Sequence, residues 1–556
     1  MRKIGWLVVV AALLAVSPSY AVAPIALHRA EGPIAVDGDL GDAGWQNAAR
    51  IDTFYETSPA DNQPPPVKTV ALLTYDGQAF YIGIHAFDPD PSKIRAPYVD
   101  RDQVIGTDDN IAVFLDTRND RRSAIELRVN PRGIQGDGVY NDANQNEDFA
   151  PDFFYDTAAK IGSDGWTTEF RIPFSSLRYS SADPQTWGIL VWRNYPRDFR
   201  YFLHSAPVPR GSNCLICFAH EITGLTQLPA AGHFVAAPYV TLQGLQHPEG
   251  KPGTPFETDP LKVRTGIDVK YNPTADKTLD ITVNPDFSQI ESDVAQISAN
   301  QRFAIFYQEK RPFFLEGSDL FATPLQVAYT RTITAPSWGL RTTGKLGATA
   351  YTLLVSQDKG GGLVILPGPT ESGYALQDAK SLSAIGRLRR DYGPSFIGAI
   401  LTDRENRGGG HNRLLGPDFQ WRPSDSDAIT GQLLVSDTED RSHPEWNETS
   451  HAFNASWNRQ KQSYDVLVDV KDIGDRFRAD LGFLPQVGYR QLDGHIAKRF
   501  YPENRWLSFL RTNVDVDYQT DRNNDVTFRQ LLLGTNFFGF KNLQAVFSVR
   551  PQEQVR

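Results

Sequence analysis

The sequence predicts an all-β protein in two parts, an N-terminal β-sandwich followed by a transmembrane antiparallel β-barrel. Short strands at hairpin spacing fill the first part, and strands with strict alternation of apolar and polar residues fill the second. Beyond the first residues, no run approaches the roughly 18 apolar residues that a membrane-spanning helix needs. A membrane-inserted form of this chain would therefore have to cross with strands that close into a barrel.

Residues 1–23 have the pattern of a secretory signal peptide. Two basic residues give a positive start, an apolar run covers Ile4–Val16, and the small residues 21–23 make a cleavage site. The apolar run is too short to span a bilayer as a helix. We therefore expect an exported protein whose mature chain begins near Pro24.

Residues 24–225 are predicted to form the β-sandwich. The stretch "KTVALLTYDGQAFYIGIHAFD" predicts two strands around an Asp76-Gly77 turn, which is a strong hairpin signal. "NIAVFLDTRNDRRSAIELRV" and "GWTTEFRIPFSSL" continue the pattern of short strands separated by turn residues. Many short strands with little helical periodicity are typical of a β-sandwich.

Residues 226–556 are predicted to form the barrel. A Pro- and Gly-rich loop at 246–260 is followed by strands such as "KVRTGIDVKY" and "TNVDVDYQTD", in which one face is apolar and the other carries full charges. Roughly 16 such strands follow from His233 onward, a spacing that suits tilted strands crossing a bilayer. A water-soluble sandwich or propeller is the alternative, because it also uses alternating strands.

A segment at 284–321 interrupts the alternation and is predicted to be an insertion between barrel strands, with a short helix starting at Ser292. Its stretch "FYQEKRPFFLEG" holds Glu309 and Glu316, weak candidates for the paired carboxylates of a glycosidase. The Lys-Arg pair between them would keep both carboxylates ionised, which favours salt bridges over a general acid with a raised pKa. We therefore expect a polar seam, with the insertion folded into the lumen or holding the sandwich at the barrel mouth.

Cys214 and Cys217 are the only cysteines, and in an exported protein they predict a local disulfide. The alternative is a zinc site with His220, for which no fourth ligand is apparent nearby. The net charge of −10 and the lack of a basic tract argue against a nucleic-acid partner. No nucleophile elbow, metalloprotease motif or phosphate loop occurs, so a non-catalytic role is favoured.

Four stretches, "IAVDGDLGDAGWQNAA", "DDNIAVFLDTRND", "IELRVNPRG" and "GWTTEFRIPFSSL", resemble in that order the family 9 carbohydrate-binding modules, over about residues 30–205. The second half, marked by "NPDFSQIESDVAQISANQRFAIFYQEKRPFFLEGSDLF", resembles the uncharacterised DUF5916-type barrel-like domain that often follows such a module in exported bacterial proteins. Barrels of that type usually run longer and end in an aromatic residue, whereas this chain ends at "SVRPQEQVR". We therefore expect a shortened or fragmentary barrel.

The resemblance to family 9 modules implies sugar binding, in which aromatic rings stack on the sugar and polar side chains bind its hydroxyls. It makes carbohydrate-binding candidates of Arg128, Trp166, Trp192 and Tyr140. Core packing is the alternative role for Trp166. Ala112 stands where the family pattern leads us to expect an acid, which departs from the resemblance.

The same resemblance implies calcium in a structural role. Asp37, Asp39, Asp108 and Asp109 are the candidate ligands, because calcium takes about six to eight oxygens. The alternative role of these aspartates is to form turns.

The leading functional hypothesis is an outer-membrane barrel that binds a polysaccharide or oligosaccharide, in glycan capture or uptake linked to carbohydrate catabolism. Its partners would be the glycan and the lipid of the outer membrane. One alternative is an exported glycoside hydrolase that acts on O-glycosyl bonds. The other is a structural barrel whose sandwich has lost sugar binding.

Overall fold

A computed structural model describes residues 23–104, 106–142, 145–229, 233–248, 250, 253–287, 301–377, 379–439, 441, 444, 447–502 and 506–555. The predicted signal peptide up to residue 22 and the helix predicted to start at Ser292 lie outside these residues. Within the described part of the chain, no helix has the length and apolar character needed to cross a bilayer.

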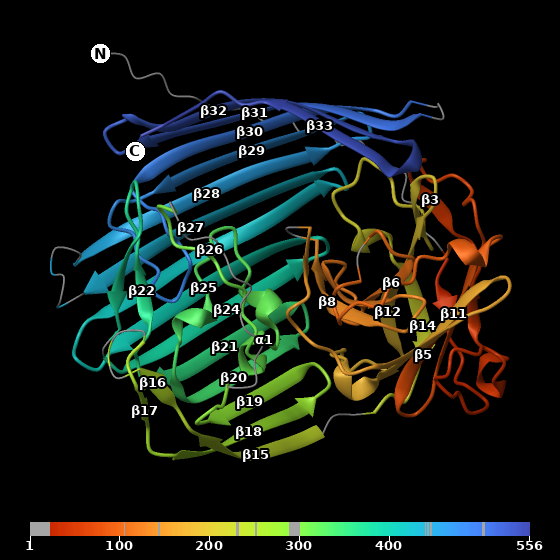
Figure 1. The fold of residues 1–556 in the computed structure, drawn as a ribbon, viewed down its shortest axis with the longest axis horizontal. Helices are drawn as coiled ribbons and strands as arrows, with labels where there is room; N and C mark the ends of the chain where they lie inside the picture. The colour runs from red at the N-terminus through yellow and green to blue at the C-terminus, as the bar shows by residue number, and fades with distance from the viewer. Residues whose placement is uncertain are drawn as a thin grey trace.

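The first part of the chain is a β-sandwich of two sheets (Figure 1). The larger sheet contains, in spatial order, β1 (Ile25–Ala26), β14 (His220–Leu225), β12 (Gln185–Pro196), β6 (Asn110–Asp116), β7 (Ser123–Val129), β8 (Gln135–Asn141) and β9 (Asn146–Asp148), while β13 (Arg200–His204) joins β12 to β3 (Tyr55–Ser58). The smaller sheet contains β10 (Asp156–Ile161), β11 (Gly165–Pro173), β5 (Ala79–Phe87), β4 (Thr69–Tyr75) and β2 (Ala49–Ile51). Short 3-10 helices connect them: η1 (Ala43–Trp45), η2 (Pro91–Lys93), η3 (Phe174–Ser176) and η4 (Ile216–Phe218).

The sandwich has an ordinary apolar core between its sheets. Leu73, Ile82 and Phe170 are completely buried there. Trp187 of the larger sheet packs edge-on against Phe80 of the smaller sheet, with 5.9 Å between the ring centroids. Alternate residues of each predicted strand supply this core, as the period of two requires.

In the second part of the chain, the described residues form one antiparallel sheet of sixteen strands, which agrees with the predicted number. In order they are β15 (His233–Gln243), β18 (Lys262–Thr274), β19 (Lys277–Val283), β20 (Pro336–Leu346), β21 (Thr349–Asp358), β24 (Ser381–Tyr392), β25 (Ser395–Asn406), β26 (His411–Ser424), β27 (Asp427–Glu439), β28 (Glu448–Gln460), β29 (Tyr464–Ile473), β30 (Tyr489–Phe500), β31 (Leu507–Asp521), β32 (Val526–Gly539) and β33 (Leu543–Val549), with β34 (Gln552–Gln554) also paired to β32. The all-β fold class is therefore confirmed. The predicted loop at 246–260 instead contains a small hairpin of β16 (Gln246–Pro248) and β17 (Phe256–Thr258).

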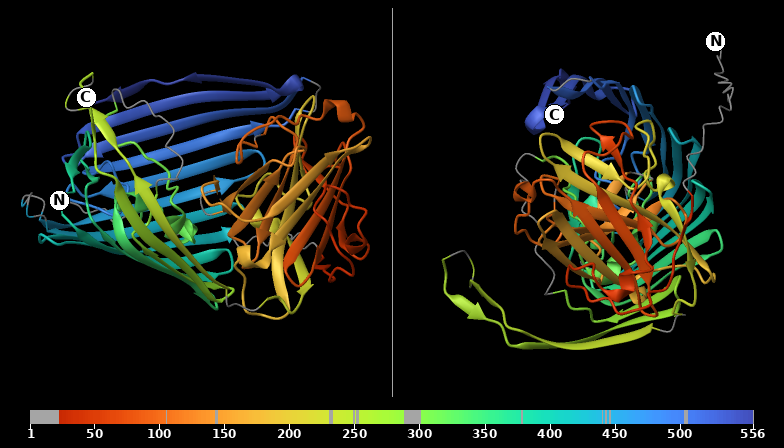
Figure 2. Two further views of the ribbon diagram at one scale, coloured as in Figure 1. Left: turned by 60° about the horizontal axis from the view of Figure 1, so that its bottom comes forward. Right: turned by 90° about the vertical axis from the view of Figure 1, so that its right-hand side faces the viewer.

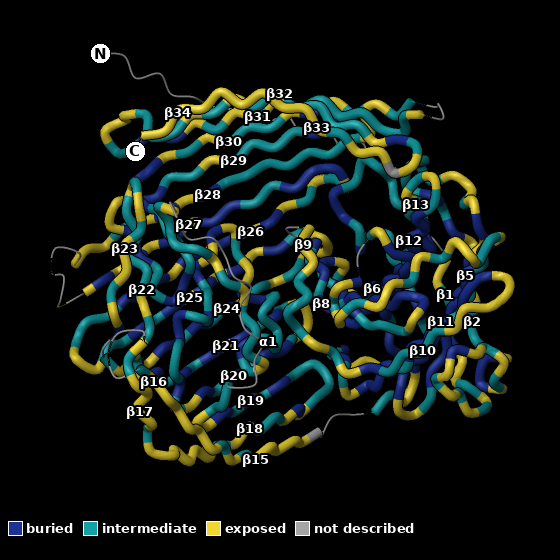
Figure 3. Tube along the Cα trace, viewed as in Figure 1, coloured by how far each residue is buried: buried dark blue, intermediate teal, exposed yellow. Residues whose placement is uncertain are grey.

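The large sheet is polar on its concave face and apolar on its convex face. In β26 the inward-facing Asn412 and Asp418 are each 1% exposed, whereas the outward-facing Leu415 is 56% exposed. The same alternation of buried and exposed residues runs along neighbouring strands (Figure 3). This polarity is the reverse of that in the sandwich, and it is the arrangement of a sheet that has lipid outside and a wet lumen inside.

The sheet curls into an incomplete ring (Figure 2), which agrees with the shortened barrel we expected, whereas the alternation alone predicted a closed cylinder. Among the described residues, β15 pairs with β18 only and β33 pairs with β32 only, so the two edges do not meet. Closure depends on strand number, tilt and register together. Alternation within single strands carries no information about strand number, tilt or register. It therefore predicted which side chains face inward, but not whether the two edges of the sheet would pair.

Two long connections between strands, β19–β20 and β29–β30, fold back into the space that the sheet encloses. We call the described residues 284–287 and 301–335, between β19 and β20, the plug; they extend past the predicted insertion and contain α1 (Pro312–Leu315), η5 (Ser318–Phe321) and η6 (Thr330–Thr332). Phe314 of the plug packs with Leu354 and Ile385 of the sheet and with Leu481 from the β29–β30 connection. The lumen is therefore partly filled. The remaining elements are a hairpin of β22 (Leu363–Leu366) and β23 (Gly373–Leu376), and η8 (Phe540–Asn542).

Candidate functional site

The sandwich sits on the end of the large sheet where the strands are joined by short turns (Figures 1 and 2). These turns are 275–276, 347–348, 393–394, 425–426 and 461–463. Long segments connect the strands at the opposite end, among them the plug and 474–488. The contact between sandwich and sheet is therefore built mostly from turns that belong to strands far apart in the sequence.

Glu316 joins the sandwich, the sheet and the plug. Lys270 of β18 donates from Nζ to Glu316 Oε2 at 2.7 Å, and Arg178 of the sandwich donates from Nε to Glu316 Oε1 at 3.2 Å. Burial raises the pKa of Glu316, but the positive charges of Arg178 and Lys270 outweigh it and lower that pKa to about 2. This carboxylate is therefore ionised at neutral pH, and we call Arg178, Lys270 and Glu316 the polar seam.

Glu309 is held inside the plug itself. It accepts hydrogen bonds from Arg311 Nε at 2.8 Å, Arg311 Nη2 at 2.7 Å and Thr330 Oγ1 at 2.6 Å. Burial raises the pKa of Glu309, and the bonds and charge of Arg311 lower it further than burial raises it. Neither Glu309 nor Glu316 has the raised pKa that a glycosidase general acid needs. Both carboxylates are held in ion pairs, Glu309 with Arg311 and Glu316 with Lys270 and Arg178, and the hydrolase role remains an untested prediction.

A second group of charges fixes the β6–β7 turn of the sandwich to the sheet. Asp120 lies 3.7 Å from Lys345 Nζ and 3.8 Å from Arg389 Nη2. Arg122 Nη1 lies 3.5 Å from Asp391, and its guanidinium sits over the Phe396 ring at 4.6 Å from the centroid. The turn thus contributes both an acidic and a basic side chain to ion pairs with the sheet.

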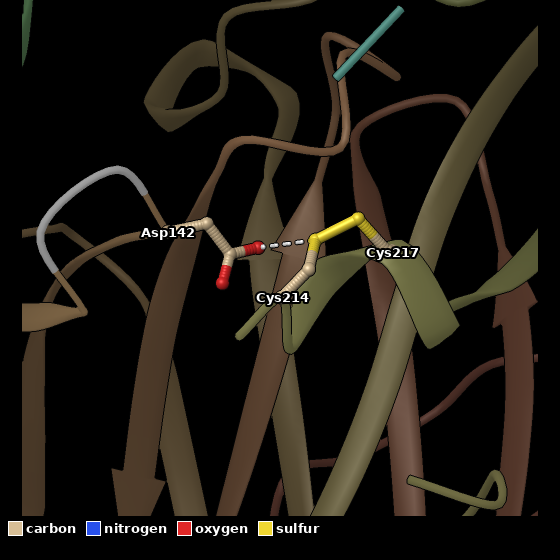
Figure 4. A group of neighbouring side chains, drawn as sticks. All are labelled: Asp142, Cys214 and Cys217. Atoms are coloured by element: carbon tan, nitrogen blue, oxygen red, sulfur yellow. Dashed lines mark hydrogen bonds between the residues drawn. A yellow bond between two sulfur atoms is a disulfide. The ribbon is translucent and has the colours of Figure 1, made fainter. Parts of the chain in front are cut away.

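Cys214 and Cys217 form a disulfide in the loop before β14 (Figure 4). Asp142 accepts backbone hydrogen bonds from Leu215 at 2.8 Å and Ile216 at 2.9 Å, and its carboxylate lies 3.3 Å from Cys214 Sγ. Disulfide sulfurs are not thiolate ligands, so this group does not hold zinc. His220 instead contacts the Ser205 carbonyl at 2.7 Å.

The disulfide loop also contacts the sheet. Arg422 of β26 donates from Nη2 to the Asp142 carbonyl at 2.6 Å and from Nη1 to the Asn213 carbonyl at 3.0 Å. The Asn213 backbone N–H donates to the Asp425 carbonyl at 3.0 Å. A rigid loop at this position stabilises the docking of the sandwich.

Arg128 and Trp192 lie together on the outer face of the larger sandwich sheet. Arg128 Nη2 lies 2.8 Å from Glu147 Oε1, and its Nε donates to Glu126. Its guanidinium sits over Trp192 at 5.4 Å and over Phe149 at 4.9 Å from the ring centroids. We call Glu126, Arg128, Glu147, Phe149 and Trp192 the aromatic–arginine cluster.

The aromatic–arginine cluster has the composition of a sugar site. Phe202 meets Trp192 edge-on at 5.2 Å, which enlarges its aromatic surface. The Trp192 indole N–H is buried with no partner among the described residues, a cost that a ligand hydroxyl or a water would remove. Burial raises the pKa of Glu126 to about 7. Rings, guanidinium and carboxylates in one place can bind the faces and hydroxyls of a sugar.

Two of the four predicted sugar-binding residues, Trp166 and Tyr140, are buried in the structure. Trp166 is 1% exposed and belongs to the sandwich core, so its ring cannot stack on a ligand without opening the sandwich. Tyr140 is 8% exposed and packs edge-on against Phe114. Burial raises the pKa of the Tyr140 hydroxyl far above its usual value.

Sequence reasoning missed Glu126, Glu147, Phe149 and Phe202. Glu126 could have been found, because it stands two residues before Arg128 in "IELRV" and strand alternation places both on one face. Glu147 and Phe149 reach Arg128 from β9 and the loop that follows it, so no local pattern relates them.

The four predicted calcium ligands do not converge. Asp37 and Asp39 shape one turn, in which the Asp39 N–H donates to Asp37 Oδ1 at 2.9 Å. Asp109 accepts from Arg197 Nη1 at 2.8 Å, and Asp108 Oδ1 accepts from Thr107 Oγ1 at 3.0 Å. In the described ranges, the one group of metal-ligating side chains close enough to share an ion is Asp142 with the disulfide cysteines. The donors as they stand do not fit calcium, which remains a prediction from the resemblance.

Two cavities adjoin the seam. One, of about 640 Å³, lies between the sandwich, the edge of β18 and the plug, with Arg178, Lys270 and Glu316 in its wall. The other, of about 850 Å³, lies inside the curved sheet, and Glu147 of the aromatic–arginine cluster lines it. Both volumes fall in the range of ligand sites, about 300–1,000 Å³.

Residues 236–343 match the family model described as "Domain of unknown function (DUF5916)", which confirms the predicted resemblance over that range. A family 9 carbohydrate-binding module (CBM9) from Caldicellulosiruptor kristjanssonii, solved in complex with cellotriose, is 17% identical; the match covers 36% of this chain and 92% of the module, with a TM-score of 0.26. OccAB2 of Acinetobacter baumannii is 7% identical, over 80% of this chain and 91% of its own, with a TM-score of 0.27. OccK8 (OprE) of Pseudomonas aeruginosa is 10% identical, over 80% and 93%, with a TM-score of 0.27. No curated protein matches the chain in sequence. With TM-scores this low, the structural likenesses carry no functional weight.

Proposed function

We propose that this protein is an exported outer-membrane barrel protein whose sandwich binds a glycan beside the lumen, in glycan capture or uptake. The observation that carries the proposal is the position of Glu147, which pairs with Arg128 in the aromatic–arginine cluster and also lines the larger cavity. A sugar bound to the cluster would lie next to the space enclosed by the sheet.

The convex face of the large sheet supports a membrane location. Large apolar side chains are exposed along most of its strands, and they form a surface that a water-soluble monomer rarely shows. Exposed aromatic residues gather near the short-turn end: Phe234, Tyr271, Tyr392, Trp421, Phe500, Trp506 and Phe538. Aromatic residues are enriched where a barrel meets the membrane interface.

The turn lengths support an orientation. In outer-membrane barrels the periplasmic turns are short and the extracellular loops are longer. The sandwich docks on the short-turn end, through contacts such as Asn213 with Asp425 and Asp120 with Lys345. The sandwich therefore faces the periplasm in this proposal, and uptake would deliver the glycan towards it.

Oligosaccharide binding by the full chain in detergent tests the proposal. The probes are cellotriose, maltotriose and xylotriose, and calorimetry measures the affinity. We expect Trp192→Ala to weaken binding at least about tenfold, since a buried interface tryptophan contributes about 2 kcal/mol or more. Trp421→Ala is the matched control, because Trp421 is 49% exposed on the convex face away from the cluster.

Two results would reject this function. Absence of binding by all three probes and by a wider glycan array would leave a structural barrel with a relic module. Equal binding by the wild type and Trp192→Ala would place the sugar elsewhere. Circular dichroism of both variants shows whether a loss of binding reflects a loss of folding.

A further inference from the structure

The two cavities at the seam share part of their walls. Val139 of β8 and Leu315, Ser318 and Asp319 of the plug line both. Each of these four side chains is half-buried. The outer cavity reaches the molecular surface, because Phe154, which lines it, is 71% exposed. The inner cavity lies against the sheet wall, where Asn454 and Ser456 line it.

The plug next to this shared wall contacts both the sandwich and the sheet. Asp319 lies 3.7 Å from Arg118 of the sandwich. On the plug side, Gly317 has a φ of +62°, and a Cβ atom there would come within 2.7 Å of the Thr343 side chain of β20. Only a glycine lets the plug lie this close to the wall. These two contacts fix the plug side of the wall that the cavities share.

The inner cavity has a lining that suits neutral, hydroxyl-rich molecules. Uncharged polar side chains enter it from all three parts, among them Asn146, Gln308 and Thr430. Aromatic rings accompany them, including Phe306 and Tyr329, whose centroids lie 5.1 Å apart. The charged side chains in the wall are of both signs, as with Lys471 and Asp469 at 3.2 Å. Such a lining offers donors, acceptors and ring faces to a hydroxyl-rich molecule.

We infer that neutral oligosaccharides move between the molecular surface and the lumen through a constriction formed by Val139, Leu315, Ser318 and Asp319. The inference rests on the proposed function, since it supplies the route to the aromatic–arginine cluster. It adds to that function a path, a narrowest point and a preference for uncharged solutes.

A single introduced thiol tests the constriction. The chain has two cysteines, and both are in the disulfide, so Ser318→Cys gives the full chain one reactive thiol. We expect the neutral reagent methyl methanethiosulfonate to modify it in detergent-solubilised protein. On this inference a bound oligosaccharide extends from the aromatic–arginine cluster into the constriction and covers residue 318. At ten times its measured Kd it leaves about one eleventh of the sites free, so modification should slow about tenfold. Ser463→Cys, in the exposed turn after β28, is the control that sugar should not protect.

The outcomes separate this inference from the proposed function. If a sugar binds the full chain but does not slow modification of Ser318→Cys, the route is wrong and the function stands. If no sugar binds, the function fails; modification of Ser318→Cys at a rate similar to Ser463→Cys then still supports an open constriction, and no modification overturns it. Leu315→Cys repeats the measurement at a second shared residue if Ser318→Cys does not fold.

Discussion

The sandwich and the large sheet are built from the same alternating strands but bury opposite kinds of side chain. In the sandwich, Ile82 and Phe170 are fully buried between two sheets. In the large sheet, Ser383 and Asp418 face inward and are at most 1% exposed, while Leu388 on the outside is 60% exposed. A period of two therefore predicts that a strand has one polar and one apolar face. Which of the two faces is buried depends on whether the strand lies in water or in lipid.

The largest effect should come from removing detergent. We expect the full chain to aggregate in plain buffer and to be monodisperse in detergent, because the convex face of the sheet exposes a continuous apolar surface. Size-exclusion chromatography with light scattering measures this. A monodisperse monomer in plain buffer would contradict the assignment of the convex face to lipid.

A matched pair of arginine substitutions sharpens the comparison. Val191 is completely buried in the sandwich core, and Val191→Arg should destabilise the sandwich by more than about 4 kcal/mol, since it buries an unpaired charge. Leu433 is 49% exposed near the middle of β27, and Leu433→Arg should cost about 2–4 kcal/mol in a bilayer.

Urea unfolding in phospholipid vesicles measures both substitutions. For a residue exposed to water, the change at Leu433 would cost no more than about 0.5 kcal/mol. A value that small in vesicles would show that β27 does not face lipid.

The seam should respond to acid. The pKa of Glu316 is lowered from 4.5 to about 2 in the folded protein, because Arg178 and Lys270 outweigh the effect of burial. A lowered pKa stabilises the folded state above the unfolded pKa, and this stabilisation, about 3 kcal/mol, is lost as the pH falls from about 4.5 to 2. We expect docking of the sandwich to weaken over that range.

Limited proteolysis of the connection between β14 and β15 measures this docking. Glu316→Gln should weaken docking at pH 7 and reduce the acid dependence, since it leaves Arg178 and Lys270 without their shared anion. Glu257→Gln, on the exposed β17, is the matched control. Equal acid sensitivity in wild type and Glu316→Gln would mean that another carboxylate holds the seam.

The smallest effect should come from calcium. Asp37 and Asp39 shape a turn, and Asp109 pairs with Arg197. Chelation of calcium should therefore change the free energy of unfolding of the full chain by no more than about 1 kcal/mol, and the melting temperature only by the corresponding small shift. Scanning calorimetry with EDTA or with excess calcium checks this. A larger stabilisation by calcium would mean that these carboxylates rearrange around the ion.

Local patterns predicted the elements well and the contacts between them poorly. The alternation in "TNVDVDYQTD" predicted a strand with a charged face, and it lies in β31. Strand alternation could also have assigned Trp166 to the core, unlike Trp192, because it places Trp166 on the same face of its strand as Phe170, which is a core residue. The ion pair of Glu316 with Arg178 joins residues 138 positions apart, and no local signal relates them.

The docking surface of the sandwich has a consequence for the order of assembly. Its partners on the sheet extend from Thr278, in the third strand, to Phe540, just before the last long pairing. That surface is complete only when nearly all the strands are in place. Because the sandwich precedes the sheet in the sequence, a sandwich that folds first would stay undocked until the strands that contact it have paired.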